Sequence, residues 1–284
     1  MRCAWKELLG ILPPWLRQNV DRQGKTDLQE LRLRLGLPPE LVTARGSFLL
    51  DRAVSGDDLH FCINTASRYS PWAAATAAQG YITAPGGHRI GLCGEASVRD
   101  GVMTGIRNPT SLCIRVARDL PGIGEKAAKL PGNLLILGRP GSGKTTLLRD
   151  LIRQLSDAGP GSVAVVDERG ELFPVVTSGS CFPTGQRTDV LTGCGKGAGI
   201  DLALRTMGPS TIGVDEITAE GDCQALMRAG WCGVRLLATA HAASAEDLRS
   251  RPIYRKLLEV GLFDQLLIMQ PDKSWRGEKM GRYI

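Results

Sequence analysis

Residues 138–145 have the sequence Gly-Arg-Pro-Gly-Ser-Gly-Lys-Thr, and this octapeptide limits the possible folds of the chain more than any other segment. It fits the pattern G-x-x-x-x-G-K-[ST] at every fixed position. An apolar strand candidate at 134–137 runs directly into it, and leucines at helical spacing follow until Gly159. In this order the glycines let successive backbone N–H groups point at one phosphate, and the helix N-terminus adds a favourable dipole. The sequence therefore predicts a phosphate-binding loop rather than a chance glycine-rich turn.

The chemistry of such a loop assigns roles to its residues. Lys144 is expected to pair with the β and γ oxygens of a nucleoside triphosphate, and the Thr145 hydroxyl is expected to ligate Mg²⁺. We therefore expect ATP and Mg²⁺ as cofactors and ATP hydrolysis as the reaction. The predicted nucleotide-binding residues of the loop are Gly138, Arg139, Pro140, Gly141, Ser142, Gly143, Lys144, Thr145 and Thr146.

Paired acidic residues follow two later strand candidates. One strand ends in Asp215 and Glu216, which are predicted to hold Mg²⁺ and to orient the attacking water, respectively. A solvated acidic turn is the alternative. Asp167 and Glu168 end another strand, and because adjacent strand ends lie about 5 Å apart, their carboxylates could reach the same water or metal ion. An exposed loop with internally paired charges is the other interpretation of that segment.

His241 follows a further strand candidate at 234–238. It could hydrogen-bond the γ-phosphate, and a buried structural histidine is equally well supported. Arg187 and Arg205 are better explained as surface arginines than as groups that stabilise a transition state. The predicted catalytic residues are Glu216, Glu168, Lys144 and His241, and the predicted metal ligands are Thr145 and Asp215.

The pattern of apolar segments predicts two domains. The first contains short β-prone runs, including a hairpin around Pro85-Gly86-Gly87, and a stretch rich in Gly, Pro and Lys at 119–132 is expected to link it to the second. From Asn133 onward, apolar strands alternate with helical segments, which indicates βαβ units. The predicted fold is α/β: a P-loop NTPase (RecA-like) domain at 126–284, with a mostly parallel sheet and helices on both faces, after a smaller α+β domain at 1–125.

Composition narrows the function classes. The chain has 43% hydrophobic and 23% charged residues, as globular proteins do, and its 5% aromatic content argues against a stacking platform for single-stranded nucleic acid. The net charge of +6 does not choose among anionic partners. Eight cysteines form no C-x-x-C pair and three histidines lie far apart, so zinc is not expected. Without a secretory leader or an apolar run of about 18 residues, we expect free thiols in the cytosol and only peripheral membrane contact.

Three segments resemble the type II and type IV secretion ATPases. They are Leu-Arg-Thr-Met-Gly-Pro at 204–209, Ile-Gly-Val-Asp-Glu-Ile at 212–217 and Leu-Ala-Thr-Ala-His-Ala at 237–242. Those enzymes carry a Leu-Arg-x-x-x-Pro segment, a modified Walker B motif that ends in glutamate, and a histidine box. An acidic "Asp box" follows the strand after their Walker A loop.

The resemblance bears on the acidic residues in two ways. Asp167 and Glu168 resemble the Asp box, which favours Glu168 as a site residue. Secretion ATPases usually have glycine before the Walker B glutamate, whereas this chain has Asp215. The acidic residues of this chain could therefore share the binding of Mg²⁺ in a different way from those enzymes, and either Glu168 or Glu216 could orient the water.

More closely, the chain resembles the stage III sporulation AA family of this superfamily. The supporting segments lie at 30–34, 80–89, 166–169 and 185–191, and the likeness covers most of the chain after its first 25 residues. It implies a homo-oligomeric ring, a hexamer, with ATP between one subunit's catalytic domain and a neighbour's N-terminal domain. Arg89 and Arg115 are similar to the N-terminal arginines that secretion ATPases present to that nucleotide.

The resemblance also implies a cellular role. The protein would drive assembly or operation of a channel between mother cell and forespore, at the cytoplasmic face of a membrane, held there by channel proteins of the sporulation apparatus. Direct contact with nucleic acid is not expected. Two other classes remain open: a nucleic-acid-stimulated P-loop ATPase or translocase, which polynucleotide would stimulate with steep salt dependence, and a scaffold that binds ATP without useful turnover.

Overall fold

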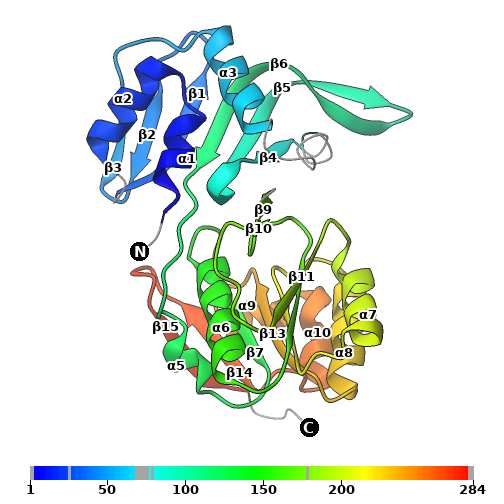
Figure 1. Ribbon diagram of the computed structural model, residues 1–284. Coiled ribbons are helices and arrows are strands. Elements are labelled where there is room, and N and C mark those ends of the chain that lie inside the picture. The colour runs from blue at the N-terminus through cyan, green and yellow to red at the C-terminus, as the bar shows by residue number, and fades with distance from the viewer. Residues whose placement is uncertain (1–2, 25–26, 68–76, 78–79, 177–178, 281–284) are drawn as a thin grey trace. The chain divides into compact units, whose positions relative to one another are not determined.

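The computed structural model describes the chain apart from residues 1–2, 25–26, 68–76, 78–79, 177–178 and 281–284 (Figure 1). The described residues form two compact units. The first comprises the residues up to Asp119 together with Pro174–Phe182, and the second comprises Leu120–Phe173 and the residues from Pro183 onward. The predicted domain limits, 1–125 and 126–284, stay a prediction.

The first unit packs helices on an antiparallel sheet. Its strands follow the order β3-β2-β1-β6-β5-β4, and every neighbouring pair is antiparallel. The segment Pro174–Phe182 belongs to this unit, where the Phe182 ring lies against Gly87. The elements of the unit are α1 (Trp5–Gly10), α2 (Pro14–Gln23), β1 (Leu28–Arg34), β2 (Glu40–Thr43), β3 (Gly46–Leu49), α3 (Gly56–Ser67), β4 (Tyr81–Thr83), the 3₁₀ turn η1 (Pro85–Gly87), β5 (Arg89–Arg99), β6 (Val102–Arg115), β9 (Val175–Val176) and β10 (Gly179–Ser180).

Apolar and charged side chains alternate along β1, and the helices pack on the face of the sheet that carries the apolar ones. In β1, Leu31 and Leu33 are fully buried while Arg32 and Arg34 lie on the opposite face, as the period of two along a strand requires. The leucines pack in one core with apolar residues of α1, α2 and α3. The arginine-bearing face has no part in that core.

The second unit is built on a mostly parallel sheet in the order β11-β8-β12-β13-β7-β14-β15, in which only β15 runs antiparallel to its neighbour. Its elements are α5 (Glu125–Ala128), β7 (Leu134–Leu137), α6 (Lys144–Ala158), β8 (Val163–Asp167), β11 (Thr188–Thr192), α7 (Lys196–Thr206), β12 (Thr211–Val214), α8 (Glu220–Trp231), β13 (Arg235–Ala240), α9 (Ala245–Ser250), α10 (Pro252–Glu259), β14 (Gln265–Met269) and β15 (Trp275–Lys279).

Two glycines show how closely helices cover both faces of this sheet. A Cβ on Gly213 of β12 would lie 2.8 Å from Cδ1 of Ile152, so α6 lies on that face. A Cβ on Gly199 of α7 would lie 2.4 Å from Cγ1 of Val166, so α7 lies on the other face. Apolar residues of α7, α8 and α10 share one core with that second face. The predicted α/β class, a mostly parallel sheet with helices on both faces after an α+β portion, is confirmed.

The hairpin predicted around Pro85-Gly86-Gly87 is confirmed, because β4 and β5 pair as antiparallel strands on either side of η1. The elements differ from the sequence expectation in the linker and in the strand expected at 111–116. The stretch predicted as a linker at 119–132 contains α5, and Asp119 within it is fully buried. The strand expected at 111–116 is the end of a fourteen-residue strand, β6, which forms a long hairpin with β5 (Figure 1). Within the part of the chain that the structure describes, no helix combines the length and apolar character that crossing a bilayer requires.

We expect Leu151→Ala, in the middle of α6, to lower the free energy of unfolding by about 2–5 kcal/mol, because the Leu151 side chain is fully buried. Urea titration followed by circular dichroism measures this loss. Leu202→Ala is the control, since that side chain is 41% exposed on α7 and should cost no more than about 0.5 kcal/mol. Equal losses in the two variants would contradict the packing described here.

Candidate functional site

Four parallel strands of the second unit end side by side at one edge of the sheet. They lie in the order β8-β12-β13-β7. Strand β7 leads into the glycine loop at 138–145, β13 is followed by His241, β12 by Asp215 and Glu216, and β8 ends in Asp167. Carboxyl ends of parallel strands are where open α/β sheets bind ligands. The fold therefore gathers the predicted site residues of this unit at one place.

The glycine loop has the backbone conformation that phosphate binding requires. Gly141 and Gly143 have φ values of +74° and +101°, which only glycine adopts readily, and α6 begins immediately after Gly143. A Cβ on Gly138 would lie 2.4 Å from the Ser142 hydroxyl oxygen. That oxygen is buried and has no hydrogen-bond partner among the described residues. A phosphate oxygen at the loop would satisfy it.

Lys144 is folded back onto the loop. Its ammonium donates to the backbone oxygens of Gly138 at 2.9 Å and Arg139 at 3.0 Å, and to Nδ1 of His241 at 3.1 Å. Burial lowers the pKa of Lys144 from its ordinary value, and the nearby carboxylates of Asp215 and Glu216 oppose that shift. These three acceptors use all three N–H donors of the ammonium.

The same contact fixes the tautomer of His241. A lysine ammonium can only donate, so Nδ1 of His241 accepts and the ring proton sits on Nε2. Nε2 lies 3.1 Å from Oε1 of Glu216, to which it can donate. A continuous hydrogen-bond chain therefore runs from Lys144 through His241 to Glu216.

Asp215 is held between two hydroxyl groups. Thr145 donates to one carboxylate oxygen at 2.8 Å, and Thr239 donates to the other at 2.6 Å. The Thr239 hydroxyl also accepts the backbone N–H of Glu216 at 2.8 Å. Glu216 has φ = 53°, a left-handed conformation that costs a non-glycine residue about 1–3 kcal/mol and is most often retained at functional sites.

The donor set suits Mg²⁺ bound together with a nucleotide. The Thr145 hydroxyl and the Asp215 carboxylate supply hard oxygen ligands, which Mg²⁺ prefers. Among the described residues, no group of three or more His, Cys, Asp or Glu side chains could hold a metal ion by itself. An ion at this position would complete its shell with phosphate oxygens and water, as Mg²⁺ does in many nucleotide sites.

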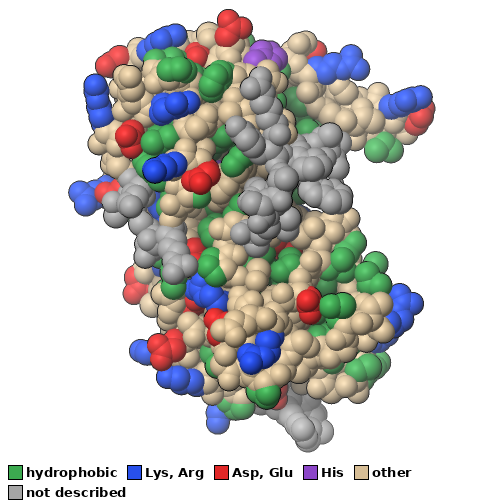
Figure 2. Space-filling view, in the orientation of Figure 1, with side chains coloured by type: hydrophobic (Ala, Val, Ile, Leu, Met, Phe, Trp, Pro, Cys, Tyr) green, Lys and Arg blue, Asp and Glu red, His purple; other side chains and the backbone are tan. Residues whose placement is uncertain are grey.

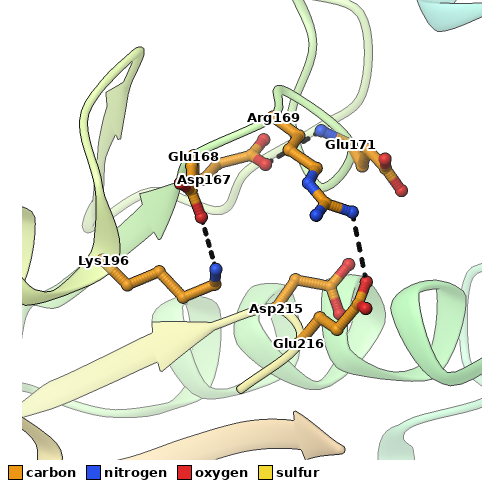
Figure 3. Close-up of a pocket in the computed structure, with 7 residues that line it drawn as sticks. All are labelled: Asp167, Glu168, Arg169, Glu171, Lys196, Asp215 and Glu216. Atoms are coloured by element: carbon orange, nitrogen blue, oxygen red, sulfur yellow. Dashed lines mark hydrogen bonds and ion pairs between the residues drawn. The ribbon is translucent and has the colours of Figure 1, made fainter. Parts of the chain in front are cut away.

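Figure 3 shows a pocket between the ends of β8 and β12. It is lined by Asp167, Glu168, Arg169, Glu171, Lys196, Asp215 and Glu216. Five carboxylates and two cations therefore face the same small space. The two cations offset part of the repulsion among these acids.

Asp167 organises its own loop. It is 1% exposed, and its oxygens accept the backbone N–H groups of Glu171, Leu172 and Phe173 at 2.8 to 3.0 Å. Burial raises the pKa of Asp167 from 3.8 to about 6, and the hydrogen bonds from Phe173 and Leu172 oppose the shift. With its oxygens engaged in this way, Asp167 shapes the turn that carries Glu168.

The two cations of the pocket bind different carboxylates. Lys196, at the start of α7, forms an ion pair with Glu168 and lies 3.8 Å from a carboxylate oxygen of Asp222. Arg169 lies 3.5 Å from Glu216. The exposed fractions of their side chains are 4% for Lys196 and 46% for Arg169.

The structure brings together most of the residues singled out in the sequence. Lys144, Thr145, Asp215, Glu216 and His241 are joined by the contacts described above, and Glu168 lines the same pocket as Asp215 and Glu216. Their predicted roles in binding and catalysis stay predictions.

The two arginines predicted to reach nucleotide belong to the first unit. Arg89 stacks on the Tyr81 ring at 4.1 Å, and Arg115 lies 3.9 Å from Glu30. Arg187 and Arg205 of the second unit are exposed, as expected of surface arginines.

Sequence reasoning missed Thr239 and Lys196. A polar residue two positions before His241 in a buried strand was a usable signal for Thr239. Nothing local distinguishes Lys196, because its significance comes from contacts with residues 28 and 26 positions away, Glu168 and Asp222.

Comparisons with known proteins give one family and one fold. A family model described as "Sporulation stage III, protein AA" matches residues 6–283. The chain is 35% identical to "Stage III sporulation protein AA" of Bacillus subtilis, over 94% of this chain and 92% of that protein.

Two solved structures share the fold at low sequence identity. The Legionella pneumophila ATPase DotB matches with a TM-score of 0.56 and 16% identity, over 94% of this chain and 79% of that one. The pilus retraction motor PilT with bound ADP matches with a TM-score of 0.57 and 14% identity, over 89% and 76% of the two chains. These likenesses establish the P-loop ATPase fold.

The raised pKa of Asp167 predicts a pH dependence. A carboxyl that is harder to ionise in the folded state stabilises the fold fully below pH 3.8, and this contribution is lost as pH rises through about 6. The shift of about two units corresponds to a loss of about 3 kcal/mol. Urea titrations at several pH values should therefore show the stability of the unaltered chain, relative to Asp167→Asn, falling between pH 4 and pH 7. A pH-independent difference would contradict the burial effect.

Proposed function

This chain belongs to the sporulation stage III, protein AA family, and from that premise we propose that it is an ATP-hydrolysing motor of the secretion-ATPase type. The observation that carries the proposal is the hydrogen-bond chain from Lys144 through His241 to Glu216. It connects the loop that would hold the triphosphate to the carboxylate that would orient water. The shared fold with DotB and PilT supports the same conclusion.

Nucleotide binding would exchange contacts that the loop makes with itself. The backbone oxygens of Gly138 and Arg139 now accept from Lys144. A triphosphate offers the ammonium charged oxygens in their place, and charge-assisted hydrogen bonds are roughly twice as strong as neutral ones. The Ser142 hydroxyl gains a partner at the same time. Thr145 and Asp215 would hold Mg²⁺, which supplies charge neutralisation on the phosphate oxygens.

We assign the orientation of the attacking water to Glu216. Its carboxylate contacts His241 and Arg169, which a water molecule can replace or share because all three side chains are partly exposed. His241 lies between Glu216 and Lys144, so a change at the phosphate end of the chain reaches the carboxylate directly. Glu168 is held by a buried cation instead, which makes it less free to exchange partners.

The cellular part of the proposal rests on the family. We propose that the protein forms a hexameric ring and powers assembly or operation of a channel between mother cell and forespore. In that ring Arg89 and Arg115 would face the nucleotide of a neighbouring subunit. Channel proteins of the sporulation apparatus would hold the ring at the cytoplasmic face of a membrane. The mixture of positive and negative side chains over the face drawn in Figure 2 does not favour a nucleic-acid track there.

MgATP binding and hydrolysis test the proposal directly. Purified protein should bind MgATP in titration calorimetry and release phosphate from it, without requiring polynucleotide. Lys144→Ala should weaken binding about 30- to 100-fold, because it removes charge-assisted hydrogen bonds to the phosphates. Lys129→Ala, which removes an exposed lysine paired with Glu125, is the matched control and should bind as the unaltered chain does. Failure to bind MgATP at millimolar concentration would refute the proposal, and strong polynucleotide stimulation would favour a translocase.

Replacing Glu216 separates binding from turnover. Glu216→Gln keeps the shape of the side chain but removes the carboxylate, so kcat should fall about 10²- to 10⁴-fold while MgATP affinity changes little. Glu220→Gln, at an exposed carboxylate near the start of α8, should leave both parameters unchanged. Phosphate-release kinetics and calorimetry give the two quantities, and a kcat for Glu216→Gln close to that of the control would show that another group orients the water.

A further inference from the structure

We propose that Lys196 is a positioning residue for the ATPase reaction and that it acts by holding the Glu168 carboxylate at the pocket. The inference rests on the proposed function and extends it to a residue that no sequence motif marks. Lys196 is the first residue of α7, and its ammonium points at Glu168 from across the pocket (Figure 3).

The burial of Lys196 makes its ion pair a fixed part of the fold. Its side chain is 4% exposed, and burial of an ammonium is unfavourable unless carboxylates and hydrogen bonds compensate the charge. Glu168 and Asp222 supply that compensation. Because Lys196 cannot turn to water without losing both partners, Glu168 is held as well.

Asp222 extends the same connection to the loop that carries Glu216. A carboxylate oxygen of Asp222 accepts the backbone N–H groups of Thr218 and Ala219 at 3.0 and 3.1 Å. These residues follow Glu216 by two and three positions. Lys196 therefore joins the turn after β8 to the turn after β12, which are the two turns that bear the glutamates of the pocket.

The other cation of the pocket has the opposite character. The side chain of Arg169 is 46% exposed and lies 3.5 Å from Glu216, and exposed ion pairs of this kind contribute little to stability. It can leave Glu216 at little cost. The pocket thus combines one fixed carboxylate, Glu168, with one exchangeable carboxylate, Glu216.

A fixed Glu168 has a definite use in hydrolysis. Its side chain is 38% exposed, so the carboxylate would be able to accept a hydrogen bond from a water in the pocket while it stays paired with Lys196. Two acceptors on different strand ends define the place of a water better than one. Lys196 is buried against the carboxylates of Glu168 and Asp222, so its effect on the reaction would pass through Glu168.

A double-mutant cycle in kcat tests this inference. Lys196→Met and Glu168→Gln should each lower kcat about 10- to 100-fold, as misplacement of a reacting group does, and leave the KM for ATP within about threefold. Their combination should be no slower than the slower single variant, because both changes remove the same positioned carboxylate. Lys196→Arg, which keeps a cation, should restore most of the turnover. Lys256→Met removes an exposed lysine paired with Glu220 and should leave kcat unchanged.

Melting curves and the fraction of protein that binds nucleotide correct each kcat for unfolded material. The inference is overturned if the two single defects multiply, if Lys196→Met turns over normally, or if the defect lies in KM. It is also overturned if Lys196→Arg is no better than Lys196→Met, since a cation would then be irrelevant. Absence of turnover in the unaltered protein would refute the proposed function itself, so the two failures are distinguishable.

Discussion

The parallel pairing of β8, β12, β13 and β7 is the constraint on which the site depends. Because each strand needs its neighbour in register, a displacement of one strand would move its terminal residue away from the others. Helices on the two faces fix the sheet from either side. Gly213 lets α6 approach one face and Gly199 brings α7 onto the other, so the first residues of these helices, Lys144 and Lys196, meet the strand ends from opposite directions.

The packing that fixes the elements leaves some polar contacts exchangeable. Lys144 satisfies its donors on the loop's own oxygens and on His241, so the buried ammonium is compensated before any ligand arrives. A triphosphate would replace weaker acceptors with stronger ones and need not open the core. On the proposed function, the consequence appears at Glu216, because His241 would lose one hydrogen-bond partner and keep the other.

Local sequence rules predicted the parts of the site that lie at ends of elements. A glycine loop after a buried strand, and acidic pairs after two more strands, were sufficient to expect Asp215 and Glu216 beside Thr145. Long-range pairing was not predictable in the same way. In β6, Asn108 and Pro109 indicate a turn, and the structure shows a bulge there: Asn108 has φ = 44°, and residues 108–110 lie opposite Gly94 of β5. The strand continues because its residues pair with β5 on both sides of the bulge. Pairing with a neighbouring strand therefore reduces the local turn signal to a bulge.

The interpretation of Asp167 and Glu168 shows the same limit at the level of side chains. From the sequence they formed one acidic pair with a shared prospect of reaching water or metal. In the fold their environments diverge: Asp167 is buried under the backbone N–H groups of its own turn, while Glu168 faces the pocket and pairs with Lys196. The burial of each carboxylate and the group it pairs with decide which one supports the loop and which one is available in the pocket. Neither property follows from the spacing of residues in the sequence. Glu168 and Glu216 differ by the same criterion. The buried ammonium of Lys196 holds Glu168 in place, whereas the exposed guanidinium of Arg169 can separate from Glu216 at little cost.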